Sequence, residues 1–155
     1  MGHPVLMARQ LPTTSGERSE RLLLASTDAD VRGWTQDWLP SEVSLCGFAD
    51  YGSDVAELAR RLQVDLCLLD MGLPGDALAA LRNVAESAPA VRVVAWAASD
   101  SNPDLLEAIA AGAIGCIVGT PARDALARTL ADVVAGKPAL PRAVVTRMVS
   151  QLRLL

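Results

Sequence analysis

The chain has 155 residues, of which 51% are hydrophobic, and a formal net charge of −4 at pH 7. This length and composition are typical of one ordinary domain with a buried core and exclude a chain that is disordered throughout. The charge excludes nucleic-acid binding by bulk basicity, since Lys137 is the only lysine. The sequence has neither the ~20 consecutive apolar residues of a membrane span nor the start of a signal peptide. We therefore expect a cytoplasmic protein with no membrane partner.

Residues 1–20 mix Pro, Thr, Ser, Gly and charged residues without any period, which predicts a flexible N-terminal tail. The only histidine, His3, lies in this tail. A general base or a metal ligand needs positioned partners, so we interpret His3 as a bystander.

Short apolar runs recur from Arg21 onward, each with the length of a buried strand. They occupy residues 22–25, 43–48, 64–69, 91–96 and 114–118. Several are too continuously apolar for a sheet with one solvated face, which favours a parallel sheet covered on both sides. Cys46, Cys67 and Cys116 each lie inside one of these runs. Such positions suit buried reduced thiols better than a disulfide or a metal site.

Amphipathic stretches typical of helices separate the apolar runs. The first, residues 30–39, carries Trp34 and Trp38 one turn apart, and we prefer core packing over an aromatic ligand platform for this pair. Ser53 and Asp76 are expected to cap the next two helices, because short polar side chains accept hydrogen bonds from the first helical turn.

The two remaining helices of the alternating pattern begin near a proline and end at a glycine. The pair 102–103 (Asn-Pro) opens one that stops at Gly112, and the pair 120–121 (Thr-Pro) opens one that ends at Gly136. Five strands that alternate with five helices predict an α/β fold: a parallel sheet with right-handed crossovers and helices on both faces.

The stretch "DLCLLDMGLPGD" ends a buried strand on a carboxylate, Asp70, and continues through the turn 72–75. In an open parallel sheet the functional crevice lies at the carboxyl ends of the strands. Asp70 is therefore expected at the mouth of the sheet. The alternative interpretation is that Asp70 only accepts hydrogen bonds from the amides of the turn.

Four segments together carry a resemblance to a known family: "DLCLLDMGLPGDALAAL", "LCGFADYGSDVAELA", "LLEAIAAGAIGCIVGTPARDALARTLADVVAG" and "KPALPRAVVTRMVSQL". They resemble a response-regulator receiver domain of the NarL/FixJ (LuxR) family, over roughly residues 21–152. The resemblance implies a flavodoxin-like (CheY-like) sheet of five parallel strands in the order 2-1-3-4-5, with the receiver domain in residues 21–136.

The resemblance also implies roles for particular residues. Asp70 matches the aspartate that accepts a phosphoryl group from a histidine kinase, and Gly72 matches a position whose carbonyl binds Mg²⁺. The sequence departs from the family where Ser26 and Thr27 stand in place of two metal-binding acids.

Two further departures concern the residues that respond to the phosphoryl group. Ala97 replaces the switch Thr or Ser, and Gly119 replaces the lysine that contacts the phosphoryl group. A shifted alignment would bring Asp28 or Ser99 closer to the pocket, but it would break the fit of the flanking runs.

These departures predict an atypical receiver. With Asp70 alone, both Mg²⁺ and an aspartyl phosphate would be poorly held. We expect a regulatory and dimerisation domain of a two-component-type transcriptional regulator that is independent of phosphorylation, not an enzyme, and without metal or cofactor. The open alternatives are a conventional receiver phosphorylated on Asp70 and a small-ligand or cofactor module on the same fold. A doubly wound enzyme is disfavoured, because no GxGxxG motif, P-loop or CxxC motif follows the first strand and the folded region has no histidine.

Residues 137–155 are not needed for a five-stranded fold and form a linker followed by a predicted amphipathic helix. Five apolar positions recur with helical spacing, and four polar ones occupy other faces. The apolar set is Val144, Val145, Met148, Val149 and Leu152, and the polar set is Arg142, Arg147, Gln151 and Arg153. An exposed stripe of this size should pack on its own domain, on a second copy or on a following domain.

The resemblance implies that this segment leads into a helix-turn-helix domain. We therefore expect a homodimer that contacts DNA only through a C-terminal domain not in this chain. A histidine kinase and a small-molecule ligand stay open as further partners.

Overall fold

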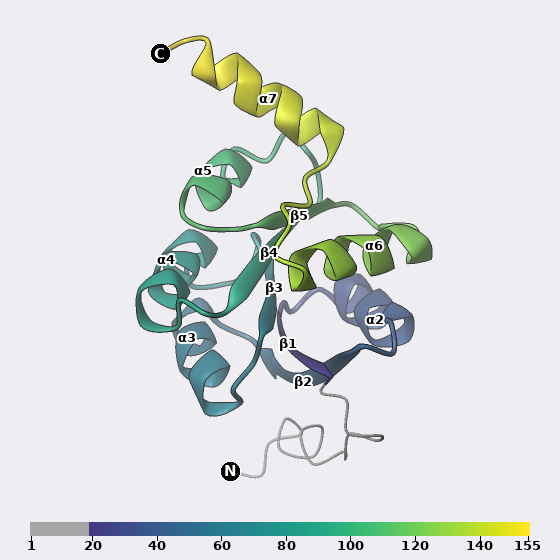
Figure 1. The fold of residues 1–155 in the computed structure, drawn as a ribbon. Helices are drawn as coiled ribbons and strands as arrows, with labels where there is room; N and C mark the ends of the chain where they lie inside the picture. Colours follow the sequence, from purple (N-terminus) through teal and green to yellow (C-terminus); the bar gives the residue numbers. More distant parts are fainter. Residues whose placement is uncertain (1–18) are drawn as a thin grey trace.

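The computed structural model describes residues 19–155, so His3 and nearly all of the predicted tail lie outside the described residues. Figure 1 shows one sheet with helices around it. The elements are, in chain order, β1 (Glu20–Ala25), α2 (Ala29–Trp38), β2 (Val43–Ala49), α3 (Gly52–Arg61), β3 (Leu66–Asp70), α4 (Ala77–Ser87), β4 (Arg92–Ala97), α5 (Leu105–Ala110), β5 (Gly115–Val118), α6 (Arg123–Val134) and α7 (Arg142–Leu152).

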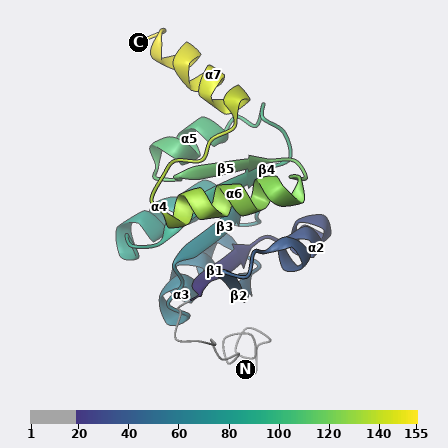
Figure 2. The same cartoon turned by 45° about the vertical axis from the view of Figure 1, so that its right-hand side comes forward.

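The five strands are parallel and lie in the order β2-β1-β3-β4-β5, which confirms the predicted sheet. Helices α2 and α6 cover one face, and α3, α4 and α5 cover the other (Figure 2). Side chains of the central strands alternate between these two layers. Leu24, Leu68 and Val94 face α2 and α6, whereas Leu69 and Ala95 face the three remaining helices. Asp70 follows as the last residue of the central strand β3.

Aromatic packing between helix α2 and the sheet agrees with the preferred interpretation of the tryptophan pair. The rings of Trp34 and Trp38 stack with centroids 6.3 Å apart. Trp34 is buried and Trp38 is half-buried, both against the core layer shared with α6. These side chains therefore belong to the core.

Of the two predicted helix caps at the crevice end of the sheet, one is formed and one is not. The Asp76 carboxylate accepts a hydrogen bond from the Ala79 amide (3.1 Å), which confirms the predicted cap of α4. The predicted Ser53 cap of α3 is wrong. This helix begins at Gly52, and the Gly52 amide donates to the carbonyl of Pro74 (2.8 Å) instead. A contact with the loop after β3 therefore determines where α3 starts.

The helices that follow a proline begin later than the sequence predicted. Helix α5 begins after Asp104, because the Asn102 side chain accepts a hydrogen bond from the Asp104 amide (2.8 Å) and holds a turn there first. Helix α6 begins after Ala122. The predicted ends are confirmed, since Gly112 and Gly136 both adopt the positive φ that terminates a helix.

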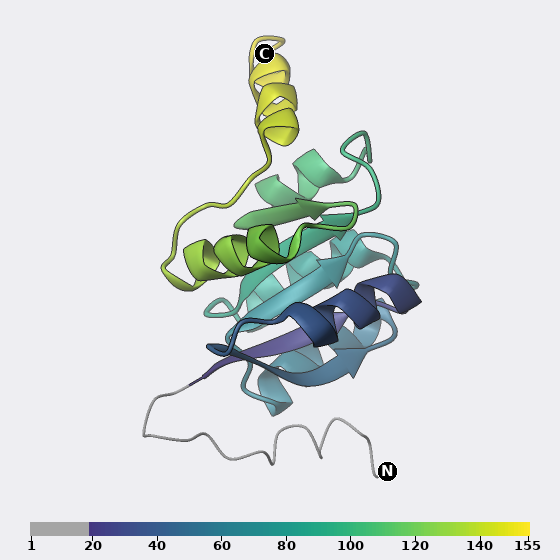
Figure 3. The same ribbon diagram turned by 90° about the vertical axis from the view of Figure 1, so that its right-hand side faces the viewer.

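The segment between α6 and α7 runs along the edge of the sheet. Ala139 forms a bridge with Gly115 of β5: the Cys116 amide donates to the Ala139 carbonyl (2.9 Å), and the Ala139 amide donates to Ile114 (3.0 Å). Helix α7 then projects from this edge (Figure 3). Its Val144 is fully buried in the layer that contains α5, which confirms the predicted amphipathic sixth helix.

Candidate functional site

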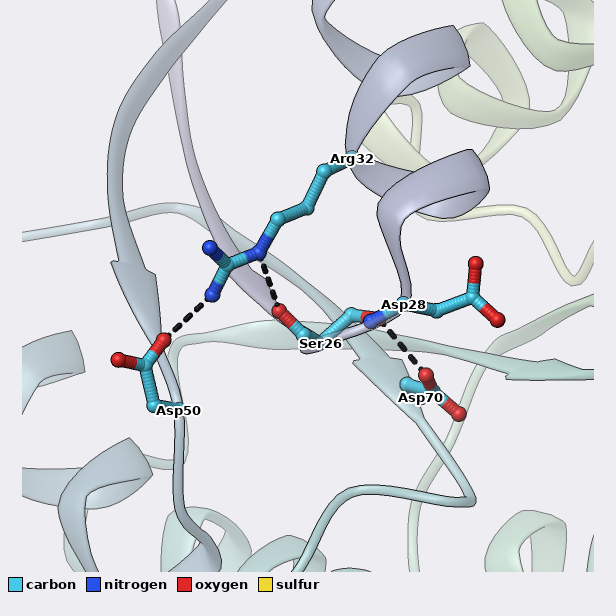
Figure 4. Close-up of polar contacts among 5 residues, drawn as sticks. All are labelled: Ser26, Asp28, Arg32, Asp50 and Asp70. Carbon is cyan, nitrogen blue, oxygen red and sulfur yellow. Dashed lines mark hydrogen bonds and ion pairs between the residues drawn. The ribbon is translucent and has the colours of Figure 1, made fainter.

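The Asp70 carboxylate lies at the carboxyl end of β3 and is only 6% exposed. Its Oδ2 accepts a hydrogen bond from the Ser26 hydroxyl (2.7 Å), and its Oδ1 accepts one from the Gly72 amide (2.7 Å). Figure 4 shows how Ser26 and Asp70 approach each other from neighbouring strands. The structure thus brings together three of the predicted site residues, and the bond from Gly72 matches the alternative interpretation of Asp70.

Ser26 follows β1 directly and is fully buried. Its oxygen also accepts a hydrogen bond from the Asp28 amide (3.1 Å), so the hydroxyl is used both as a donor and as an acceptor. Thr27 is exposed to solvent. The Asp28 carboxylate caps α2 by accepting from the amides of Asp30 and Val31, and it points away from Asp70 in Figure 4. The loop after β1 therefore supplies a hydroxyl, and no carboxylate, to Asp70.

Ala97 and Gly119 lie at the ends of the neighbouring strands β4 and β5. The Gly119 amide donates to the Ala97 carbonyl (2.9 Å), and the indole of Trp96 donates to the Gly119 carbonyl (2.7 Å). Gly119 adopts φ +66°, a left-handed conformation that disfavours most side chains. Ser99 is exposed, and its hydroxyl bonds to that of Ser101 (2.8 Å) in the loop after β4.

Sequence reasoning missed a cation at this edge of the sheet. Arg32 of α2 donates from Nε to the Ser26 carbonyl (2.6 Å) and forms an ion pair with Asp50, which directly follows β2 (Figure 4). The guanidinium also lies 4.8 Å from the centroid of the Phe48 ring. The one feature of the sequence that could have indicated this cation was its partner Asp50, an acid that follows the second strand and therefore lies at the same edge of the sheet as Asp70. Arg32 ties the loop after β1 to the end of β2.

The three cysteines are buried free thiols, as predicted. Burial raises the pKa of Cys67 to about 12 and that of Cys116 to about 11. Burial also raises the pKa of Cys46. Since the thiolate is the metal-binding and nucleophilic form, these side chains are inert at neutral pH.

The donors around Asp70 do not fit the Mg²⁺ that the resemblance implies. Mg²⁺ prefers octahedral oxygen ligands and is usually bound through one or two carboxylates together with phosphate oxygens. Among the predicted site residues Asp70 is the one carboxylate, and the loop after β1 places the Ser26 hydroxyl against its Oδ2 (2.7 Å). Across residues 19–155, no group of three or more His, Cys, Asp or Glu side chains could hold a metal ion.

Helices of the described part of the chain are all too short or too polar to cross a bilayer.

Comparison with known proteins matches the family described as "Response regulator receiver domain" over residues 22–131. The nitrate/nitrite response regulator protein NarL of Escherichia coli (strain K12) is 29% identical over 113 residues, which cover 72% of this chain and 52% of NarL. The chain spans about half the length of the curated relatives it matches.

Solved structures share the fold at lower identity. A LuxR-family response regulator from Aurantimonas sp. SI85-9A1 superposes with a TM-score of 0.75 at 19% identity, over 88% of this chain and 99% of that one. RcsB from Salmonella typhimurium gives 0.73 at 18% identity, over 84% of this chain and 65% of that one. A further RcsB structure, with a TM-score of 0.72 at 18% identity over 83% of this chain and 67% of that one, contains two dimers bound to two parallel DNAs. The family match over most of the chain and the sheet order together place this chain in the response regulator receiver domain family, close to the NarL/LuxR-type regulators.

Proposed function

We propose that this chain is an atypical receiver that works without phosphorylation of Asp70. The observation that carries the proposal is the closed carboxylate: the Ser26 hydroxyl and the Gly72 amide occupy its two oxygens in a nearly buried site. A phosphoryl group on Oδ2 would compete with the Ser26 hydroxyl for this oxygen.

The charges around the site support the proposal. A phosphoryl group adds about two negative charges, and its transfer depends on cations that neutralise the charge of the equatorial oxygens. Ser26 and Thr27 offer no carboxylate for a metal ion. Gly119 stands where the family places a lysine. The nearby cation, Arg32, is already bound to the Ser26 carbonyl and to Asp50.

The end of β4 also lacks a side chain that could form a hydrogen bond with a phosphoryl oxygen. In the family a hydroxyl at this position follows the phosphoryl oxygen. Here Ala97 is 1% exposed and supplies only a methyl group, and its carbonyl accepts the Gly119 amide. We infer that the arrangement of the loops after β4 and β5 does not depend on the state of Asp70.

Intact-mass spectrometry after incubation with acetyl phosphate and Mg²⁺ tests this function. We expect no phosphoryl adduct on the wild-type chain, and no change in its amide NMR spectrum with beryllofluoride and Mg²⁺. The double variant Ser26→Asp with Thr27→Asp restores two acids and serves as a gain-of-function control. An adduct on the wild type that Asp70→Asn abolishes would show a conventional receiver.

We further propose that the domain is the regulatory and dimerisation part of a cytoplasmic transcription regulator, with a regulatory rather than an enzymatic role. The known association of RcsB dimers with DNA supports this assignment. DNA contact would then come from a C-terminal domain, since residues 19–155 contain no helix-turn-helix unit.

A further inference from the structure

One hydrogen-bonding side chain, Arg147, ties helix α7 to the body of the domain. Arg147 donates from Nη1 to the backbone carbonyls of Asp100 and Asn102, the second at 3.2 Å. Within residues 19–155, no other side chain of α7 is hydrogen-bonded to the body. Both carbonyls belong to the loop 98–104, which begins directly after Ala97 at the crevice end of β4. The C-terminal helix therefore contacts the loop that leaves the crevice.

The apolar part of the same contact is small. Val144 is fully buried and Met148 is half-buried against the layer that contains α5. Beside them, a groove of about 480 Å³ separates the two helices, with Leu106 and Glu107 on one wall and Ser150 on the other. Few groups therefore hold α7 on the domain.

We propose that Arg147 is a clamp that couples the conformation of the loop 98–104 to the docking of α7. The guanidinium can bind both carbonyls only when the loop is folded as in this structure and α7 lies against α5. The folded loop therefore stabilises the docked helix, and the docked helix stabilises the folded loop. The loop and the helix are thus expected to change conformation together. The clamp does not depend on whether Asp70 is phosphorylated, so it stands or falls separately from the proposed function.

The loop has enough internal order to act as such a unit. The Ser99 hydroxyl accepts the Ser101 amide (3.2 Å), and the Asn102 side chain accepts the Asp104 amide (2.8 Å). These bonds hold the backbone in a turn that points two carbonyls at one nitrogen of Arg147. Loss of the turn would separate the two acceptors and weaken the hold on α7.

Release of the clamp would change the surface that the helix offers. In the docked position Val144 and Met148 face the domain, while Val145 and Val149 are 41% and 43% exposed. These four residues lie on adjoining sectors of the helix. Undocking would join them into one apolar face, so the loop would control how much apolar surface α7 presents to a partner.

Hydrogen exchange of the full chain, followed by mass spectrometry, tests the coupling. Arg147→Ala should raise exchange about tenfold both in the loop 98–104 and in α7, since it removes hydrogen bonds to a charged group. The central strands should exchange as in the wild type. Arg153→Ala, on the exposed end of the same helix, is the matched control and should change neither segment.

A second variant tests the reverse direction, because coupling between two sites is reciprocal. Asn102→Ala removes the side-chain bond to the Asp104 amide, but it leaves Arg147 and the backbone carbonyl of residue 102 in place. It should raise exchange in α7 as well as in the loop. If Arg147→Ala affected α7 alone, or if Asn102→Ala affected the loop alone, Arg147 would be a passive anchor and the inference would be overturned.

Discussion

The crevice around Asp70 and the outer face of α7 differ in whether their side chains contact other groups of the domain or are exposed to solvent. In the crevice, the carboxylate, the hydroxyl and the backbone groups of the loops bond to one another, and almost none of Asp70 is accessible. On α7, Val149 and Leu152 are 43% and 64% exposed with no covering element in residues 19–155. The site where the family performs its chemistry is closed, whereas the surface open to a partner lies at the C-terminal helix.

Thiol reactivity should give the largest difference between the two regions. Cys67 in β3 reacts only when the structure opens, so we expect it to be modified on the order of a thousandfold more slowly than in urea. A cysteine introduced by Ser150→Cys on α7 should react at nearly the unfolded rate. Stopped-flow measurement with a disulfide reagent checks both rates. A fast native Cys67 would show that the strands near Asp70 open readily.

The same thiols predict a pH dependence of stability. Burial raises the pKa of Cys67 to about 12, above the ordinary value of 9.0. The folded state therefore keeps its proton where the unfolded state loses it. Stability from this group is fully present below about pH 9 and is lost as the pH rises toward 12. Urea unfolding from pH 8 to pH 10 should show this fall, and it should be smaller in Cys67→Ala.

Two glycine substitutions should show that the crevice end is tightly packed. A side chain at Gly52 would overlap the Gly75 carbonyl, so Gly52→Ala should cost about 1–3 kcal/mol of unfolding free energy. At Gly33 in α2 nothing lies within 4 Å, and Gly33→Ala should add about 0.5–1 kcal/mol through better helix propensity. Urea unfolding measures both. If the two variants changed the unfolding free energy equally, the loop after β3 would be able to move away from the added methyl group at little cost.

Removal of the hydroxyl that closes Asp70 should have a similar or somewhat smaller cost. Ser26→Ala leaves the Oδ2 of Asp70 and the Asp28 amide without a partner, for a loss of about 1–3 kcal/mol. The adjacent Thr27 is exposed, so Thr27→Ala should stay within about 0.5 kcal/mol of the wild type. If Ser26→Ala were neutral, water would be entering the site and the crevice would not be closed.

The exposed apolar residues of α7, Val149 and Leu152, should affect self-association but have little effect on the free energy of unfolding. Val149→Asp with Leu152→Asp should change the unfolding free energy least of all. If a homodimer forms through this exposed stripe of α7, the charges should also weaken self-association at least about tenfold. Ala143→Asp with Ser150→Asp adds the same charge at other exposed positions. Sedimentation equilibrium compares the two. Equal association of both variants would exclude the stripe as the dimer contact.

Local patterns in the sequence were sufficient for most of the fold. Apolar runs separated by amphipathic stretches predicted all five strands and the helices between them, and Asp76, Gly112 and Gly136 marked helix ends correctly. The start of α3 could not be predicted from Ser53, since the Pro74 carbonyl that binds the Gly52 amide lies in a distant loop.

The sequence by itself determined the parallel sheet and the position of Asp70 at its carboxyl edge, because these follow from periodicity and chain order. Which residues are replaced was implied by the resemblance to the receiver family. Only the tertiary structure decided what the residues do there. It paired Ser26 with Asp70, placed Arg32 between β1 and Asp50, and set Arg147 against the loop after β4. Each of these contacts joins residues 18 to 47 positions apart in the chain, except the short-range bond from Arg32 to the Ser26 carbonyl. Hydrogen bonds of this kind depend on where whole elements pack, and no local pattern of residues encodes them.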